Sequence, residues 1–158
     1  MKPKHVKLAR EQLDATLGRL ESLKILVPPG KGWIRAIRDA IGMTGEQLAK
    51  RLNINKQRVS RIEHDEKLGK VKIETLRNVA EAMDCVFVYA FVPRDSLAQT
   101  VKEQAKEIAK KRMARSNQMM RLEKQELSEA EKAKAMQTII DEIVETMPKS
   151  LWDESNGI

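Results

Sequence analysis

The chain has 158 residues, which is enough for one compact domain with appendages or for two very small domains. It carries 30 Lys and Arg against 23 Asp and Glu, and the formal charge of +7 points to a polyanionic partner. Seven Gly, five Pro and 3% aromatic residues argue against an all-β sandwich or barrel, because those folds need many turns and aromatic strands. No apolar run approaches the roughly 20 residues of a membrane span, and no signal-peptide centre follows the N-terminus, so we expect a cytoplasmic protein without membrane contact.

The sequence offers no pattern that indicates catalysis or metal binding. The two histidines, His5 and His64, lie far apart, and neither has a Cys or carboxylate neighbour at ligand spacing. The single cysteine, Cys85, excludes an internal disulfide. A phosphate-binding glycine loop and a serine on a glycine turn are both missing from the sequence. We therefore predict no enzyme activity, no metal and no cofactor.

The first predicted helix covers residues 6–26, where apolar residues recur three and four positions apart. The sequence VPPGKG at 27–32 ends it, because prolines and glycines do not continue a helix. Four short helical patterns follow between Trp33 and Asp84: WIRAIRDAI, GEQLAKRL, KQRVSRIEH and IETLRNVAEAM. This part of the chain is therefore predicted to be helical with tight connections.

The spacing of apolar residues changes at the next element. The sequence CVFVYAFV at 85–92 is β-branched and aromatic, and it predicts one short strand that Pro93 ends. A single strand leaves its backbone donors and acceptors without partners. We therefore predict a homodimer in which two copies of this strand pair across a two-fold axis.

Two more helices are predicted after the strand. Ser96 with Gln99 forms a candidate capping box at the start of a polar helix that reaches about residue 126, and Ser128 with Glu131 forms a second one. The last helix carries an apolar stripe of Ala133, Met136, Ile140, Ile143 and Met147.

Charge is distributed unevenly along the chain. Residues 1–93 hold 18 Lys and Arg against 11 Asp and Glu, whereas residues 94–158 hold 12 of each. Within the second part, 102–121 is basic and 122–158 is acidic. Two interpretations remain open: the two helices neutralise each other, or the basic stretch contacts a DNA backbone.

The most informative stretch is TGEQLAKRLNINKQRVSRIEHD at 44–65. Thr44 with Gln47 three residues later forms a capping box that opens a helix. Asn53 tolerates the left-handed backbone of a sharp turn, and Asn55 is a good N-cap for the next helix. This is the pattern of a helix-turn-helix, in which the first helix holds the second so that its N-terminal residues reach base edges in the major groove.

The second helix of this pattern has an apolar and a polar face. Val59 and Ile62 point inward at a spacing of three. The outward positions are all polar and able to form hydrogen bonds: Lys56, Gln57, Arg58, Ser60 and Arg61. Basic and amide side chains on one exposed helix face favour contact with DNA over a purely solvated face.

Residues 33–84 resemble the lambda-repressor-like (XRE) helix-turn-helix family, with IRAIRDAIGMTGEQLAKRLNINKQRVSRIE following its pattern. The resemblance implies a mainly α fold with a five-helix core. It also implies that bases are read by Lys56, Gln57, Arg58 and Arg61, that Asn55 and Ser60 lie nearer the DNA backbone, and that Glu63 is structural. The domains expected are an N-terminal helix and linker at 1–30, a helix-turn-helix domain ending in the strand at 31–93, and a C-terminal helical extension at 94–158.

The whole chain is also similar to a narrower group of regulators called mobile mystery protein A. The similarity lies in LAREQLD near the N-terminus, PPGKGWIRAIRDAIGMT, DCVFVYAFVPR and SLWDE near the C-terminus. That group is encoded beside a Fic-domain protein, an enzyme class that typically transfers adenylyl groups. The resemblance therefore implies an antitoxin-like repressor with a Fic-type partner.

Two functions remain as hypotheses. In the first, the protein is a dimeric repressor that binds a palindromic operator in its own operon. In the second, it is mainly an antitoxin that neutralises its partner by direct contact, and DNA binding is secondary. The candidate partner-binding residues are apolar and lie near the C-terminus: Ile140, Ile143, Met147 and Trp152. The competing interpretation is that these residues only stabilise the fold or the dimer.

Overall fold

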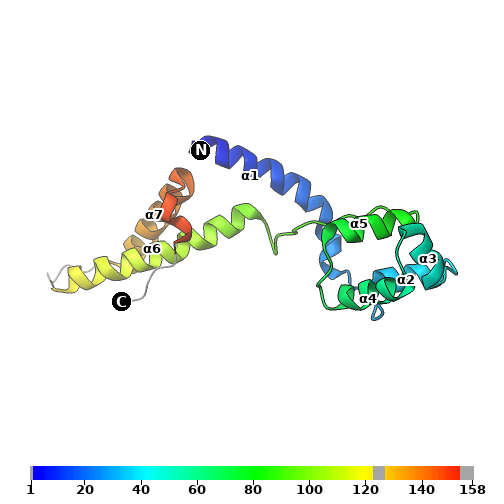
Figure 1. Cartoon of the computed structure of the whole chain (residues 1–158). Helices are drawn as coiled ribbons and strands as arrows, with labels where there is room; N and C mark the ends of the chain where they lie inside the picture. The colour runs from blue at the N-terminus through cyan, green and yellow to red at the C-terminus, as the bar shows by residue number, and fades with distance from the viewer. Residues whose placement is uncertain (1, 123–126, 154–158) are drawn as a thin grey trace. The chain divides into compact units, whose positions relative to one another are not determined.

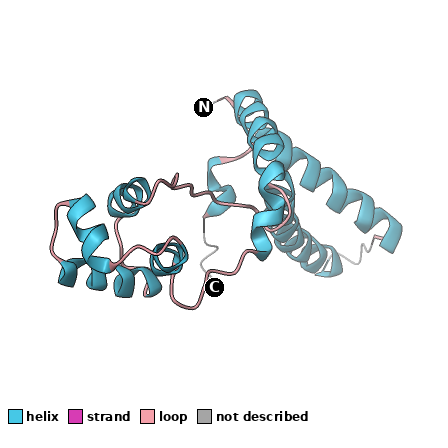
Figure 2. Ribbon diagram, turned by 90° about the vertical axis from the view of Figure 1, so that its right-hand side faces the viewer, coloured by secondary structure: helices cyan, strands magenta, loops and turns pink. Residues whose placement is uncertain are grey.

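The computed structural model describes residues 2–122 and 127–153, which form two compact units (Figure 1). We call residues 25–91 the helix-turn-helix unit, and residues 1–24 together with 92–158 the terminal unit. Helices account for 74% of the described residues, and no strand occurs among them (Figure 2). The prediction of a mainly α protein is therefore confirmed. None of the helices in the described ranges combines the length and apolar composition that a membrane crossing requires.

The helix-turn-helix unit contains four helices in its described chain: α2 (Trp33–Ala40), α3 (Gly45–Leu52), α4 (Lys56–Lys67) and α5 (Ile73–Ala82). They enclose one small core whose buried members are Ile34, Leu48, Ala49, Val59, Val79 and Met83. Leu48 and Ala49 are almost fully buried, as expected for the face of α3 against which α4 packs. The core thus fixes α4, the second helix of the predicted motif.

The strand predicted over 85–92 and the fifth helix of the core are not found in this unit. Helix α5 ends at Ala82, and Asp84 adopts a left-handed φ of 58°, which turns the chain out of the helix. Residues 85–92 then continue without regular structure, because no neighbouring segment of the described chain lies beside them to complete a ladder. The predicted strand is therefore not confirmed in the chain taken alone.

The terminal unit contains α1 (Pro3–Leu17), most of the 3₁₀ helix η1 (Gly18–Ile25), α6 (Leu97–Leu122), α7 (Glu129–Thr146) and the 3₁₀ turn η2 (Lys149–Trp152). The helix predicted over 6–26 is thus shorter in its α part, since Gly18, a weak helix former, begins the change to 3₁₀ geometry. Helix α1 packs on α6 and α7, so the N-terminal helix and the C-terminal extension share one unit.

The core of the terminal unit lies between α6 and α7. Ala105 and Ala109, one turn apart on α6 and 0% exposed, leave room for α7 to approach closely. The other buried members of this core are Val101, Ile140, Ile143 and Leu151. Asp14 of α1 accepts hydrogen bonds from the backbone N–H groups of Leu97 (2.7 Å) and Ala98 (3.0 Å), which ties α1 to the start of α6.

The two capping boxes predicted for these helices have different outcomes. At α7 the box is complete, since the N–H of Glu131 donates to Ser128 Oγ and the Glu131 carboxylate accepts from the Ser128 N–H. The hydrogen bonds that the Ser128 N–H and the Ser128 hydroxyl donate to this carboxylate lower the pKa of Glu131. At α6, Ser96 Oγ accepts from the Gln99 N–H (3.0 Å), but the Gln99 side chain bonds Glu103 instead of returning to Ser96.

Candidate nucleic-acid interface

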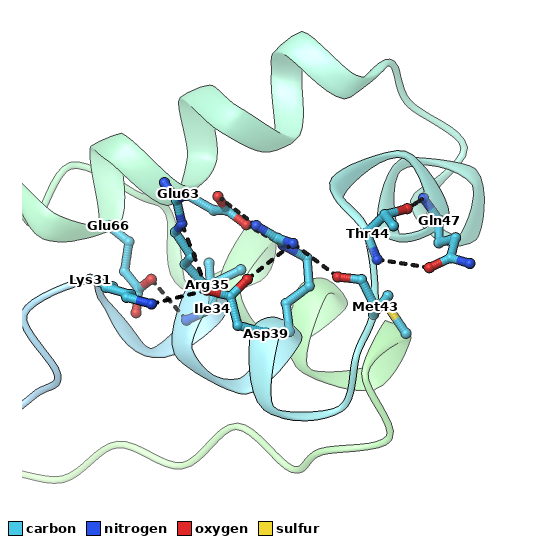
Figure 3. Close-up of polar contacts among 10 residues, drawn as sticks. Lys31, Ile34, Arg35, Asp39, Met43, Thr44, Gln47, Glu63 and Glu66 are labelled. Carbon is cyan, nitrogen blue, oxygen red and sulfur yellow. Dashed lines mark hydrogen bonds and ion pairs between the residues drawn. The ribbon is translucent and has the colours of Figure 1, made fainter.

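The first helix of the motif starts where the sequence predicts. Gln47 N–H donates to Thr44 Oγ1 over 3.1 Å, and Thr44 N–H donates to Gln47 Oε1 over 2.7 Å. These reciprocal bonds satisfy two donors that the start of α3 leaves free. The predicted capping box at α3 is confirmed (Figure 3).

The turn between α3 and α4 is made by two asparagines. Asn53 has φ 55° and ψ 43°, in the left-handed region that ends a helix sharply. Asn55 then accepts a hydrogen bond from the Arg58 N–H over 2.8 Å and so caps α4. The roles predicted for both residues are confirmed, and together they fix the position at which α4 begins.

Helix α4 separates a buried face from an exposed one. Val59 and Glu63 are 2% and 7% exposed, and Ile62 is half-buried against the core. The predicted DNA-binding residues are all exposed: Asn55, Lys56, Gln57, Arg58, Ser60 and Arg61. The outer face therefore offers side chains that donate and accept hydrogen bonds, and the inner face holds the helix in the unit.

A buried ion pair braces the inner face of α4 against α2. Arg38 Nε donates to Glu63 Oε1 over 2.7 Å, and Arg38 Nη2 lies 3.4 Å from Glu63 Oε2. Arg38 Nη1 also donates to the carbonyl oxygen of Met43 over 2.9 Å, which fixes the turn before α3. The hydrogen bond to Glu63 raises the pKa of Arg38 above its ordinary value, so the guanidinium remains charged. Glu63 has the structural position that the family resemblance implies.

A second glutamate of α4 holds the start of α2. The backbone N–H groups of Trp33 and Ile34 donate to Glu66 over 2.9 and 3.1 Å. Gly32, the N-cap of α2, has φ 83° and no side chain to cap the helix. A Cβ at Gly32 would lie 2.7 Å from Glu66 Oε2, so the glycine allows the carboxylate to approach. Sequence reasoning missed Glu66. The available signal was its position three residues after Glu63, on the same helix face, combined with a start of α2 that has no capping residue.

Basic residues also flank α4 on both sides. One shallow groove of about 270 Å³ is lined by Arg58, Arg61, Lys70 and Lys72, among others. Another of about 240 Å³ includes Lys31, Arg35, Ser60, His64 and Lys67. Sequence reasoning did not single out the lysines and the arginine contributed by neighbouring elements, because folding alone brings them beside α4. Cations on both sides of an exposed polar helix are what the two phosphate strands of a duplex groove attract.

The comparison with known families agrees with this geometry. Residues 34–86 match a family model described as helix-turn-helix, of the XRE type. Helix-turn-helix domains of this type occur in DNA-binding transcription regulators, and residues 34–86 form such a domain. Neither a curated protein nor a solved structure matched the chain.

The residues predicted to bind a partner lie in the terminal unit in three different environments. Ile140 and Ile143 are 4% and 1% exposed and belong to the α6–α7 core, so they are already covered by the chain itself. Met147 is half-buried at the end of α7, where Arg10 Nη1 lies 3.5 Å from its sulfur. Trp152 is 55% exposed. Of the four, Trp152 is the one whose large apolar side chain is mostly open to a second molecule.

Replacing Asn55 by Ala is expected to lower the free energy of unfolding of the helix-turn-helix unit by about 1 kcal/mol. The Arg58 N–H loses its acceptor, and the start of α4 frays. Asn55→Ser keeps a capping oxygen and serves as the control. Denaturant unfolding followed by Trp33 fluorescence in a Trp152→Phe background measures both variants. Equal stability of the two would contradict the capping role.

Proposed function

We propose that the protein is a sequence-specific transcriptional repressor that binds a palindromic operator as a homodimer and regulates its own operon. The observation that carries this proposal is the division of α4 between an inner face fixed by Val59 and Glu63 and an outer face of exposed polar side chains. A helix held in this way presents hydrogen-bonding groups at fixed positions, which reading base edges requires.

The side chains of α4 have distinct expected roles. Arg58, Arg61 and Lys56 are suited to the acceptors O6 and N7 of guanine, and Gln57 is suited to the N6 and N7 groups of adenine. Asn55 and Ser60 lie nearer the DNA backbone in this proposal, together with the cations of the two flanking grooves. Two copies with recognition helices about 34 Å apart would then read two half-sites one helical turn apart.

The proposed biological setting is an antitoxin-like role beside a Fic-domain protein. The similarity of LAREQLD, PPGKGWIRAIRDAIGMT and SLWDE to regulators encoded beside such enzymes supports this part of the proposal. The second candidate function is a protein-interaction antitoxin that neutralises its partner directly. One observation favours it: the buried Leu151 anchors η2, and the next residue, Trp152, remains exposed on the terminal unit.

The test of the DNA-binding proposal is titration of the purified protein with the promoter DNA of its own operon, in competition with random DNA of equal length. We expect the promoter to be preferred by about three orders of magnitude or more, as for specific regulators. Equal competition by random DNA would show that the outer face of α4 carries no sequence readout, and the proposal would fail.

The partner contact is tested with Trp152→Ala. If Trp152 is a binding anchor, affinity for the neighbouring Fic-domain protein should fall by about 2 kcal/mol or more, since buried aromatic anchors dominate such interfaces. Operator binding should not change. Leu122→Ala is the matched control, because Leu122 is an exposed apolar residue of the same unit, 82% exposed. Isothermal titration measures both variants, and unchanged affinity of the Trp152 variant would assign Trp152 no role in capture.

A further inference from the structure

The segment between α5 and α6 is apolar and open to solvent. Val86, Val88 and Phe91 are 87%, 77% and 87% exposed. No hydrogen bond within the described chain involves the backbone of residues 86–92. A run of β-branched and aromatic residues with unpaired N–H and C=O groups is a template for another strand.

Exposed and half-buried side chains alternate over residues 85–88. Cys85 and Phe87 are half-buried against their own unit, whereas Val86 and Val88 are exposed. The rings of Phe87 and Tyr89 stack with centroids 6.1 Å apart, which places them on one face. Such alternation is that of an extended backbone with the period of a β-strand. In the single chain, the segment therefore already has the side-chain arrangement of a β-strand.

An apolar pocket of about 390 Å³ is lined in part by residues 85–88 of the segment. The rest of its lining comes from α2, α5, Leu26 and Glu66 of α4, and it includes Trp33, Ile37, Leu76 and Met83. Trp33 remains 40% exposed beside it. An open apolar pocket next to an unpaired backbone is suited to an apolar side chain that arrives on an extended segment.

We propose that the occupant is a second copy of this chain, whose residues 86–92 pair antiparallel with the same residues of the first and place Phe91 at this pocket. The inference deepens the proposed function, because it assigns the surface that makes the regulator a homodimer. Antiparallel pairing centred on Tyr89 sets residue 87 opposite residue 91 of the second copy. Phe91 of the second copy then lies beside Phe87, which lines the pocket.

Charge complementarity selects a second copy in this register. The pairing that centres on Tyr89 also brings residue 84 of each copy near residue 94 of the other, just outside the paired residues, so Asp84 and Arg94 meet at each end. Both residues are exposed, and neither has an ion pair within the described ranges. A parallel arrangement would instead oppose Asp84 to Asp84 and Arg94 to Arg94, which is unfavourable. Residues 85–93 carry no charge, so nothing between the two ends opposes the pairing.

The first test compares Val88→Lys with Val27→Lys in the full chain. Both substitutions put a lysine at a largely exposed valine of the same unit, 77% and 81% exposed, but only Val88 lies in the segment. Sedimentation velocity should show a dimer for the unmodified protein and for Val27→Lys. For Val88→Lys the dimer dissociation constant should rise about tenfold or more, because a cation at the centre of the pair opposes strand association. A monomeric unmodified protein, or equal dimerisation of the two variants, would overturn the inference.

The second test uses charge and does not depend on the first substitution. Arg94→Glu and Asp84→Lys should each weaken the homodimer, since each places like charges opposite one another. Mixing the two variants should restore dimerisation as a heterodimer, because both end pairs then become oppositely charged. Circular dichroism confirms that each variant keeps its helices. Unchanged dimerisation of the single variants, or no recovery on mixing, would contradict the antiparallel register.

Failure of this inference is separable from failure of the proposed function. Binding to DNA with a single half-site reports base reading by one copy. If Val88→Lys loses affinity for the full palindrome but keeps base discrimination on the half-site, both proposals stand. Discrimination by a dimer that Val88→Lys does not weaken overturns only the inference about residues 86–92. A dimer that does not discriminate between half-site and random DNA overturns only the proposed function.

Discussion

Operator affinity is expected to fall by about three to five orders of magnitude between 50 and 200 mM salt if the dimer neutralises roughly six to ten phosphates. Two kinds of residue contribute to this binding in different ways. Arg58 lies on the outer face of α4 and is proposed to contact bases, whereas Lys72 lines the groove beside it and is proposed to contact phosphates.

The variants Arg58→Ala and Lys72→Ala should therefore change different properties of DNA binding: the first its sequence specificity, the second its affinity for any sequence. Arg58→Ala should cost about 1–3 kcal/mol for each base that is no longer read and relax specificity at one position of each half-site. Lys72→Ala should weaken binding to all sequences alike and reduce the salt slope by about 0.9 for each phosphate that the variant no longer neutralises. Arg77→Ala, an exposed arginine of α5 outside both grooves, is the control. Fluorescence anisotropy at several salt concentrations measures these effects, and an identical response to both substitutions would refute the division of roles.

Removal of Arg38 is expected to destabilise the helix-turn-helix unit by about 3–5 kcal/mol, because it leaves the Glu63 carboxylate buried without its partner. The side chains of Arg38 and Glu63 are 12% and 9% exposed, so water replaces little of the missing interaction. A loss of this size is a large share of the stability of an ordinary small domain, about 5–15 kcal/mol in total. Arg38→Ala should therefore also lower DNA binding, through loss of the folded state.

The double variant Arg38→Met with Glu63→Leu is the control for this experiment. Replacing both members of a buried pair by apolar residues is often neutral or stabilising, so the double variant should recover most of the loss. Denaturant unfolding in a Trp152→Phe background lets Trp33 report on the helix-turn-helix unit alone. A change below about 1 kcal/mol for Arg38→Ala would place this pair among the weak exposed ion pairs. The pKa of Arg38 is raised in the folded state. The stability that its charge contributes is therefore fully present below its unfolded-state pKa and is lost only as the pH rises through its folded-state pKa.

Local signals explain which parts of the motif could be predicted from the sequence. The roles of Thr44, Asn53 and Asn55 were predictable because each acts on backbone groups within a few residues of itself. Glu66 acts on the N–H groups of Trp33 and Ile34, more than thirty positions earlier in the chain. No local pattern contains that pairing, and only the packing of α2 on α4 creates it.

The predictions about the rest of the chain depended on knowing what covers an apolar stripe. Ile140 and Ile143 lie on the stripe that periodicity correctly finds on α7, but periodicity does not say whether α6 or a second protein lies against it. The two alanines of α6, Ala105 and Ala109, decide this by allowing close approach. Residues 85–92 show the opposite case, since their composition favours a strand but a strand exists only beside another.

The braces of α4 come from its inner face, through Glu63 and Glu66, and the outer face contributes none of the buried packing. Sequence changes at Lys56, Gln57 and Arg61 therefore meet little resistance from folding. A duplicated gene could therefore change these residues and recognise a new DNA sequence while the core of the helix-turn-helix unit stays the same. Two such duplicates in one cell would bind different operators and would not regulate each other's operons. The difference in specificity would depend on a few exposed residues of α4.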